Sequence, residues 1–145
     1  MSLLNEDTLK DIALAQNVIT NEDVSVVVVD NGKIWIKKKG QGIRPFLEVI
    51  EEMGDEIHYS VIGDRIIGRA SALLCRYSKV RAVYSPQATK TAIALLIMGS
   101  IPAQVDKLIP FIKNHDGSDL CPFEKMLENV GSPAEAYNIL KEKLL

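Results

Sequence analysis

The sequence contains two cysteines, one tryptophan and no hydrophobic run of membrane-spanning length. Cys75 and Cys121 cannot build a dense disulfide framework, so a reducing cytosol is the default compartment and we expect a cytoplasmic protein. The longest apolar stretch, residues 92–98, is far shorter than the roughly 20 residues that a membrane-spanning helix requires. The N-terminus lacks a basic segment followed by an apolar one, so neither secretion nor membrane insertion is predicted.

An excess of positive charge is also absent. The formal net charge is −2 and the isoelectric point is near 5.7. The densest basic run, Lys37 to Lys39, ends at Gly40 and is interpreted as edge lysines that discourage strand-to-strand aggregation. Since no basic field is available to follow a phosphate backbone, no nucleic-acid partner is expected.

The remaining composition is that of one ordinary globular domain. The chain has 145 residues, of which 47% are hydrophobic and 25% are charged. This length suffices to bury most of the surface that the unfolded chain exposes. We find no internal repeat, low-complexity tract or linker. We therefore expect a single domain over residues 1–145, with a core at about 24–130 and a helix at each end.

The first half of the chain predicts a helix, a hairpin and a second helix. Asn5 is a suitable N-cap for an amphipathic helix, and Asp30-Asn31-Gly32 is turn chemistry between two β-rich segments. Pro45 suits the first turn of a helix that Gly54 ends. The predicted ranges are 6–16 and 45–53 for the helices, and 24–29 and 33–37 for the strands.

The second half alternates strands with helices. Ser85-Pro86 is interpreted as the N-cap and first-turn proline of a long helix, and Ser132 to Glu135 as a capping box. Alternating strands and helices imply crossover connections and parallel strand pairs. The predicted fold is therefore a three-layer α/β domain, with a mixed, mostly parallel sheet, an antiparallel N-terminal hairpin and covering helices. The predicted strands are 58–62, 80–84 and 104–108, and the helices are 68–77, 85–98 and those beginning near 121 and 132.

Polar residues with candidate chemistry lie where strands end and helices begin. Asp64 follows an apolar strand, where open α/β sheets place ligands, and it equally fits an aspartate of a turn or helix entry. Gly68, Arg69 and Ser71 begin a helix whose free amides could bind an anion, and Arg44 is a similar candidate. The alternative is that Gly68 permits close packing while the arginines face water.

Cys121 is a candidate nucleophile, because it precedes Pro122 at a predicted helix start, where the helix dipole favours a thiolate. Nearby carboxylates, including Glu124, oppose that effect, and His115 is the only local candidate base. The alternative is a structural cysteine, with Glu124 bonding to backbone amides. Cys75 lies in an apolar helix and is interpreted as a core residue.

Trp35 alternates with Ile34 and Ile36 in the second hairpin strand, so its side chain faces the opposite way from both. It marks either a covered second face or an association surface.

Three segments, Gly42 to Leu47, Asp64 to Leu74 and Cys121 to Glu124, resemble an uncharacterised domain-of-unknown-function family that has a cytidine-deaminase-like fold. The resemblance spans roughly residues 24–130 and implies the fold without an established reaction. Zinc-dependent deaminases carry His-x-Glu or Cys-x-Glu at one helix start and Pro-Cys-x-x-Cys at the next. Those positions hold Arg44-Pro45-Phe46 and Gly68-Arg69-Ala70-Ser71. We therefore expect no zinc-dependent deamination, no metal site and no cofactor.

Three functional hypotheses compete. The first is a zinc-free protein that binds a small nucleotide-like or anionic ligand in the cleft of this fold. The second is a non-catalytic module that self-associates or holds a partner protein through Trp35 and the hairpin edge, and the third is a thiol-dependent enzyme using Cys121. Convergence of polar side chains in one pocket would favour the first over the second. The catalytic candidates are Asp64, Cys121 and Glu124, and the ligand-binding candidates are Arg44, Asp64, Gly68, Arg69 and Ser71.

Overall fold

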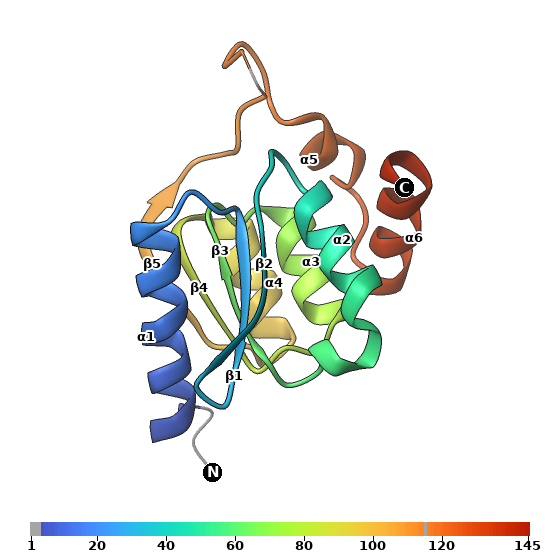
Figure 1. The fold of residues 1–145 in the computed structure, drawn as a ribbon. Helices are drawn as coiled ribbons and strands as arrows, with labels where there is room; N and C mark the ends of the chain where they lie inside the picture. The colour runs from blue at the N-terminus through green and yellow to red at the C-terminus, as the bar shows by residue number, and fades with distance from the viewer. Residues whose placement is uncertain (1–3, 115) are drawn as a thin grey trace.

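The computed structural model of the chain describes residues 4–114 and 116–145. Its elements follow each other as helices and strands that alternate after an N-terminal helix and hairpin (Figure 1). In chain order they are α1 (Glu6–Asn21), β1 (Val26–Asp30), β2 (Lys33–Lys38), α2 (Arg44–Met53), the 3-10 helix η1 (Gly54–Ile57), β3 (Val61–Asp64), α3 (Arg69–Tyr77), β4 (Ala82–Thr89), α4 (Lys90–Met98), β5 (Ala103–Ile109), α5 (Pro122–Met126) and α6 (Pro133–Leu144).

The five strands form one mixed sheet in the order β2-β1-β3-β4-β5. The β1–β2 hairpin is antiparallel, and β1 also pairs antiparallel with β3. The pairs β3–β4 and β4–β5 are parallel, as expected for strands joined by the crossover helices α3 and α4. The predicted α/β fold with a mixed sheet and an antiparallel hairpin is therefore confirmed.

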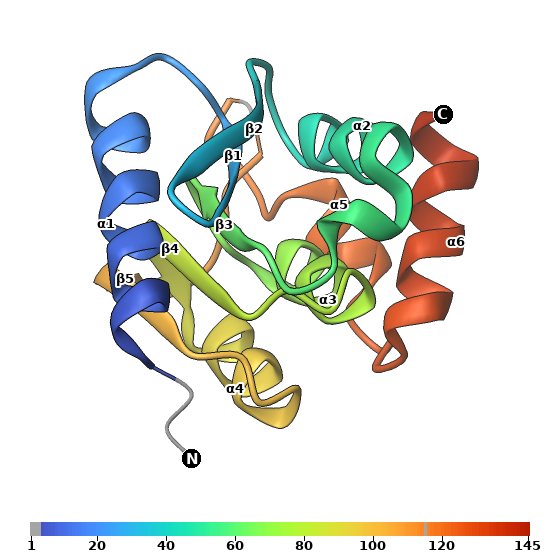
Figure 2. The same ribbon diagram turned by 60° about the horizontal axis from the view of Figure 1, so that its bottom comes forward.

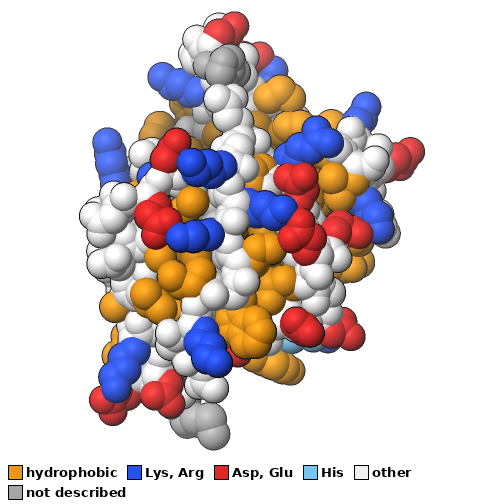
Figure 3. Space-filling view, viewed as in Figure 1, with side chains coloured by type: hydrophobic (Ala, Val, Ile, Leu, Met, Phe, Trp, Pro, Cys, Tyr) orange, Lys and Arg blue, Asp and Glu red, His pale blue; other side chains and the backbone are white. Residues whose placement is uncertain are grey.

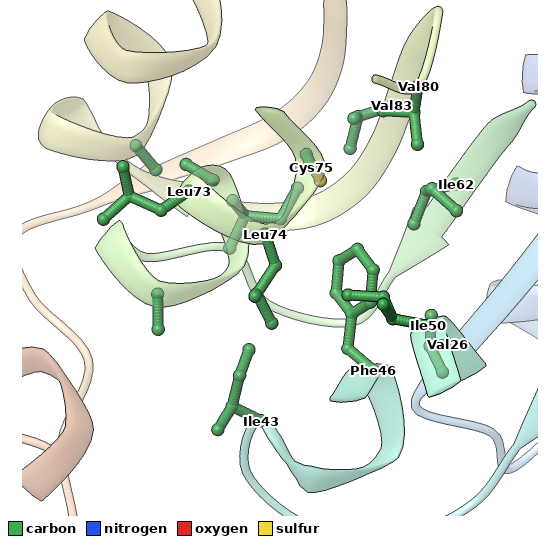
Figure 4. Close-up of a cluster of buried hydrophobic side chains, with 14 of the residues drawn as sticks. Val26, Ile43, Phe46, Ile50, Ile62, Leu73, Leu74, Cys75, Val80 and Val83 are labelled. Carbon is green, nitrogen blue, oxygen red and sulfur yellow. The ribbon is translucent and has the colours of Figure 1, made fainter. Parts of the chain in front are cut away.

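Helices cover both faces of the sheet and give three layers (Figures 1 and 2). Successive strand residues point to opposite faces, so Val27 and Val29 of β1 pack under α1, while Val26 and Val28 face the other side. That other side carries the larger hydrophobic core. Figure 4 shows Phe46 and Ile50 of α2 between Leu74 of α3 and Ile62 of β3.

One predicted helix start is wrong. Ser85-Pro86 does not open a helix, because β4 continues through both residues to Thr89, and α4 begins at Lys90. Ser85 through Thr89 pair with β5, and Thr89 and Gln87 also exchange backbone bonds with Ile67. Pairing with two neighbouring segments therefore outweighs the local capping chemistry, and Thr89 becomes the N-cap by accepting a bond from the Ala92 amide at 3.1 Å.

Two other boundaries also move. The first helix runs on to Asn21 because Val18 and Ile19 continue its buried face. The strand predicted at 58–62 lies at Val61–Asp64, which brings Asp64 into the sheet itself. The expected caps at Asn5 and Ser132 are both present. No helix within the described ranges is long and apolar enough to span a membrane.

Candidate functional site

Asp64 is the last residue of β3, and its carboxyl group is 92% buried (8% exposed). It accepts hydrogen bonds from the Ser71 hydroxyl and from the backbone amides of Ile66 and Arg65. Burial opposes ionisation more strongly than these bonds favour it, and the pKa of Asp64 is raised to about 7. Near neutral pH, this carboxyl group therefore exists in both the protonated and the ionised form.

The segment that carries Asp64 is anchored by its neighbour Arg65. The Arg65 guanidinium donates to the carbonyl oxygens of Val24, Ile19 and Glu22, at 2.7 to 2.9 Å. Two of these carbonyls lie at or just beyond the C-terminal end of α1, where backbone acceptors lack helical partners. Arg65 thus points away from Asp64 and fixes the turn that leads from β3 toward α3.

A cavity of about 720 Å³ opens beside Asp64. Most of its walls come from four segments: residues 40–42 before α2, 64–66 at the end of β3, 112–114 after β5, and 121–123 at the start of α5; Ser25 and Asp116 complete the lining. Figure 1 shows the loop before α2 and the long segment before α5 rising from the same end of the sheet. The cavity lies at the carboxyl end of β3, where ligands bind in open α/β sheets.

The lining combines an apolar body with a few polar groups. Ile66, Ile112 and Phe123 provide apolar surface, while Gln41 and Asn114 present side-chain amides. The Asp64 carboxyl and the Cys121 thiol lie in the same walls. This mixture of apolar surface and few polar groups is typical of small-molecule sites.

The N-terminus of α3, predicted as an anion site, is occupied by a carboxylate of the chain itself. Glu124 accepts hydrogen bonds from the Arg69 amide at 2.7 Å and the Ala70 amide at 2.9 Å. The Arg69 side chain donates to the Val130 carbonyl at 3.0 Å. A Cβ atom on Gly68 would lie 2.2 Å from the Glu124 carboxylate, so Gly68 permits this close approach. The alternative interpretation of Glu124, as a partner of backbone amides, describes what is observed.

The predicted site residues thus divide into two groups. Asp64 and Cys121 line one cavity, and Ser71 reaches it through its bond to Asp64. Gly68, Arg69 and Glu124 instead form the capped start of α3; Arg69 and Glu124 line a smaller neighbouring cavity of about 300 Å³. Arg44 is exposed at the start of α2. His115, the candidate base, lies outside the described residues.

Sequence reasoning missed Gln41, Asn114 and Phe123 as cavity residues. Gly40 and Gly42, both with positive φ, flank Gln41 in the loop before α2, at this end of the sheet. Asn114 and Phe123 reach the cavity because the chain returns across the sheet edge after β5. No local signal indicates that return. Among the described residues, no group of three His, Cys, Asp or Glu side chains is placed to hold a metal ion.

The two cysteines differ in accessibility. Cys75 is 0% exposed, and burial raises the pKa of its thiol, with a smaller contribution from Asp64, whereas Cys121 is partly exposed at the cavity. We expect iodoacetamide to label Cys121 before Cys75 in the folded protein, because the thiolate is the reactive form. A timed labelling series read by mass spectrometry measures the order. Equal rates, or faster labelling of Cys75, would contradict this assignment of burial.

The fold and the cavity define a class: a three-layer α/β domain with a cavity at the carboxyl end of a central strand. The model of the family described as domain of unknown function DUF1893 matches residues 14–144. The chain belongs to this family. No functionally curated protein matches it significantly.

Solved structures agree with this membership. The crystal structure of a DUF1893 family protein from Thermotoga maritima superposes with a TM-score of 0.85 at 22% identity, covering 97% of this chain and 92% of that chain. At this identity the match shows a shared fold. Two forms of RibD from Acinetobacter baumannii give TM-scores of 0.48 and 0.47 at 16% and 15% identity. The match covers 68% of this chain but only 35% of RibD, so nothing further is drawn from it.

Proposed function

We propose that the protein binds a small ligand with a nucleobase-like ring in the cavity beside Asp64. The observation that carries the proposal is the Asp64 carboxyl, buried at the wall of a cavity of about 720 Å³. Pockets that bind small molecules usually have volumes of roughly 300 to 1,000 Å³, and this cavity falls within that range. A buried carboxyl that faces such a space is a polar group that a ligand can pair with.

The chemistry of the lining favours a flat heterocycle over a free anion. Apolar walls at Ile112 and Phe123 suit the faces of a ring, and the Gln41 amide suits its polar edge, whereas the Asn114 side chain already bonds with Ser118 and with the Asp119 amide. With a pKa of about 7, Asp64 can either donate or accept a hydrogen bond at neutral pH. The α3 amides, the natural anion site, already bind Glu124. An anionic ligand, the other possibility within the first hypothesis, therefore has less support at this cavity than a nucleobase-like ring.

The competing interaction module depends on the hairpin edge. Trp35 and Ile34 on the edge strand β2 are 54% and 40% exposed. On the face seen in Figure 3, basic and acidic side chains are interspersed with small hydrophobic patches. Lys37 and Lys38 of the same strand form ion pairs with Glu22 and Glu52. Because edge lysines oppose strand pairing, the convergent cavity supports ligand binding better than this edge supports association. A thiol-dependent reaction at Cys121 is not part of the proposal.

A thermal-shift screen of nucleobases, nucleosides and nucleotides, followed by calorimetric titration of each hit, tests the proposal. We expect at least one heterocycle to raise the melting temperature, and Asp64→Asn to weaken its binding by about tenfold, the loss of roughly one buried hydrogen bond. Phe123→Ala should weaken it as well. Asp23→Asn, at an exposed aspartate, is the matched control and should bind normally. The proposal fails if no compound binds, or if the Asp64 variant binds as tightly as the unaltered protein.

A further inference from the structure

Arg76, in the last turn of α3, is a cation without a partner. Its Nη1 atom is fully enclosed and makes no hydrogen bond within residues 4–114 and 116–145, and Arg76 forms no ion pair with them. Arg65 and Arg69, by contrast, donate to backbone carbonyls, and Arg81 pairs with Asp11 and Asp30. Arg76 as a whole is only partly buried, but an enclosed guanidinium nitrogen without a hydrogen-bond acceptor is costly and suggests a ligand that supplies one.

The packing of Arg76 fixes its stem in place. A Cβ atom on Gly99 would lie 2.8 Å from Arg76 Cγ and 3.2 Å from both Cδ and Nε. The absence of a side chain at position 99 thus makes room for the aliphatic part of Arg76. The guanidinium is thereby positioned without being neutralised. Such a group is prepared to meet a ligand at low entropic cost.

Arg76 lines two adjoining cavities of about 580 and 500 Å³. Their walls include the residues just before β3, β4 and β5, so they lie at the opposite end of the sheet from Asp64. This end is turned toward the viewer in Figure 2, between α3, α4 and α6. A site here is therefore separate from the cavity beside Asp64.

A second polar group at the same place is also unpaired. The Ser78 side chain lines the 580 Å³ cavity and is 98% buried (2% exposed), and its hydroxyl has no hydrogen-bond partner among the described residues. Serine hydroxyls that are buried normally find a partner. Arg76 and Ser78 are the two residues of the described chain with such buried, unpaired side-chain atoms, and both residues belong to the walls of this cavity.

The charges that surround this space favour an anion. Lys79 lines both cavities and forms no ion pair with any described residue. Of the acidic residues in the walls, Glu51 is already held by Lys141 at 3.3 Å and by the Tyr137 hydroxyl. Asp55 is exposed, and its Oδ1 atom lies 3.8 Å from His58 Nε2. The cationic side chains of these walls that form no ion pair with a described residue are therefore those of Arg76 and Lys79.

We propose that the paired cavities around Arg76 bind a phosphate group, with Arg76 as the bidentate donor and Ser78 and Lys79 as supporting donors. An arginine fork matches two oxygens of a tetrahedral oxyanion, while a lysine adds a point charge and a hydroxyl adds a neutral hydrogen bond. Tyr59, Tyr77 and Tyr137 also lie in the walls of these cavities. Their rings provide apolar surface for an organic group attached to the phosphate. The site takes either free phosphate or a phosphate monoester.

Titration of the full chain with inorganic phosphate and with phenyl phosphate, followed by NMR at constant ionic strength in chloride, tests this site. We expect saturable binding that Arg76→Met weakens by about tenfold or more and Ser78→Ala weakens by a smaller factor. Lys39→Gln removes an exposed cation just beyond β2, at the other end of the sheet, and should leave binding unchanged. Tighter binding of phenyl phosphate would identify a monoester as the ligand, and equal binding would identify phosphate itself.

A stability measurement separates this role from a structural one. Methionine retains the aliphatic stem that packs at Gly99 and removes an unpaired charge, so Arg76→Met should unfold at the same urea concentration as the unaltered protein, or a higher one. If Arg76 instead stabilised the fold, Arg76→Met would lower the urea concentration at which the protein unfolds. The proposal is wrong if phosphate binding does not saturate, if the Arg76 and Lys39 variants bind equally well, or if the Arg76 variant is destabilised while its phosphate affinity is retained. None of these outcomes depends on the cavity beside Asp64.

Discussion

Asp64→Asn is expected to gain about 2 to 3 kcal/mol of stability relative to the unaltered protein between pH 5 and pH 8. The folded protein holds the pKa of Asp64 at about 7, against an ordinary value of 3.8 for an aspartate, chiefly because the carboxyl is buried. Between these two pKa values the folded state keeps a proton that the unfolded state has released. Raising the pH therefore favours the unfolded state, and the stability contributed by the protonated carboxyl is lost as pH rises through about 7.

Urea unfolding of both proteins at half-unit steps from pH 5 to pH 8 measures this difference. Asparagine has no titratable proton, and its side-chain oxygen still accepts bonds from the Arg65 and Ile66 amides. All other titrating groups are shared by the two proteins, so they cancel in the comparison. For the control Asp23→Asn, the free energy of unfolding should change with pH as it does in the unaltered protein. Parallel curves for Asp64→Asn would show that Asp64 ionises in the folded protein at its ordinary pKa.

The local parts of the fold could be predicted from sequence because short-range chemistry determines them. Asn5 and Ser132 accept bonds from amides three residues on, and the Asn31-Gly32 turn joins two β-rich segments. The alternation from Val26 to Val29 likewise distributes side chains to two cores. These signals lie within a few residues of the structures that they specify.

The wrong helix start at Ser85-Pro86 shows where local chemistry stops being sufficient. A serine followed by proline favours a helix N-terminus, but β4 is paired on both sides beyond that point. The strand therefore wins through bonds to residues that are distant in the sequence. The same limit applies to the candidate site: the apolar residues before Asp64 indicate a strand end there, whereas Gln41, Asn114 and Phe123 reach the cavity only through the tertiary fold.

Glu124 and Arg76 illustrate the limit for charged groups. Glu124 caps a helix that begins 55 residues earlier, and no spacing rule connects the two segments. Arg76 was placed in a helix from its sequence, but what distinguishes it is the lack of a partner in three dimensions. A sequence shows which charges exist, and the folded chain decides which of them remain unpaired.

Gly68→Ala is expected to destabilise the protein by roughly 2 kcal/mol, through loss of the Glu124 cap. The φ of Gly68 is −114°, which other residues adopt without strain, so the cost is one of space. The added Cβ would lie 2.2 Å from Glu124 Oε1 and 2.4 Å from Ile112 Cδ1. Glu124 must then withdraw and give up its bonds to the Arg69 and Ala70 amides. Those charge-assisted bonds satisfy helix amides that have no intrahelical acceptor.

A double-mutant cycle with Glu124→Ala separates this mechanism from a general intolerance at position 68. Both substitutions remove the same bonds, so the double variant should lose about as much stability as the worse single variant, and much less than the sum. Any additional loss should come from the Ile112 contact that the alanine methyl still makes. Gly131→Ala is the matched control, because a Cβ there meets no described atom within 4 Å. Urea unfolding of the five proteins gives the coupling free energy directly. Additive losses would show that Gly68 is required for a reason other than the approach of Glu124, and the capped start of α3 would then need another explanation.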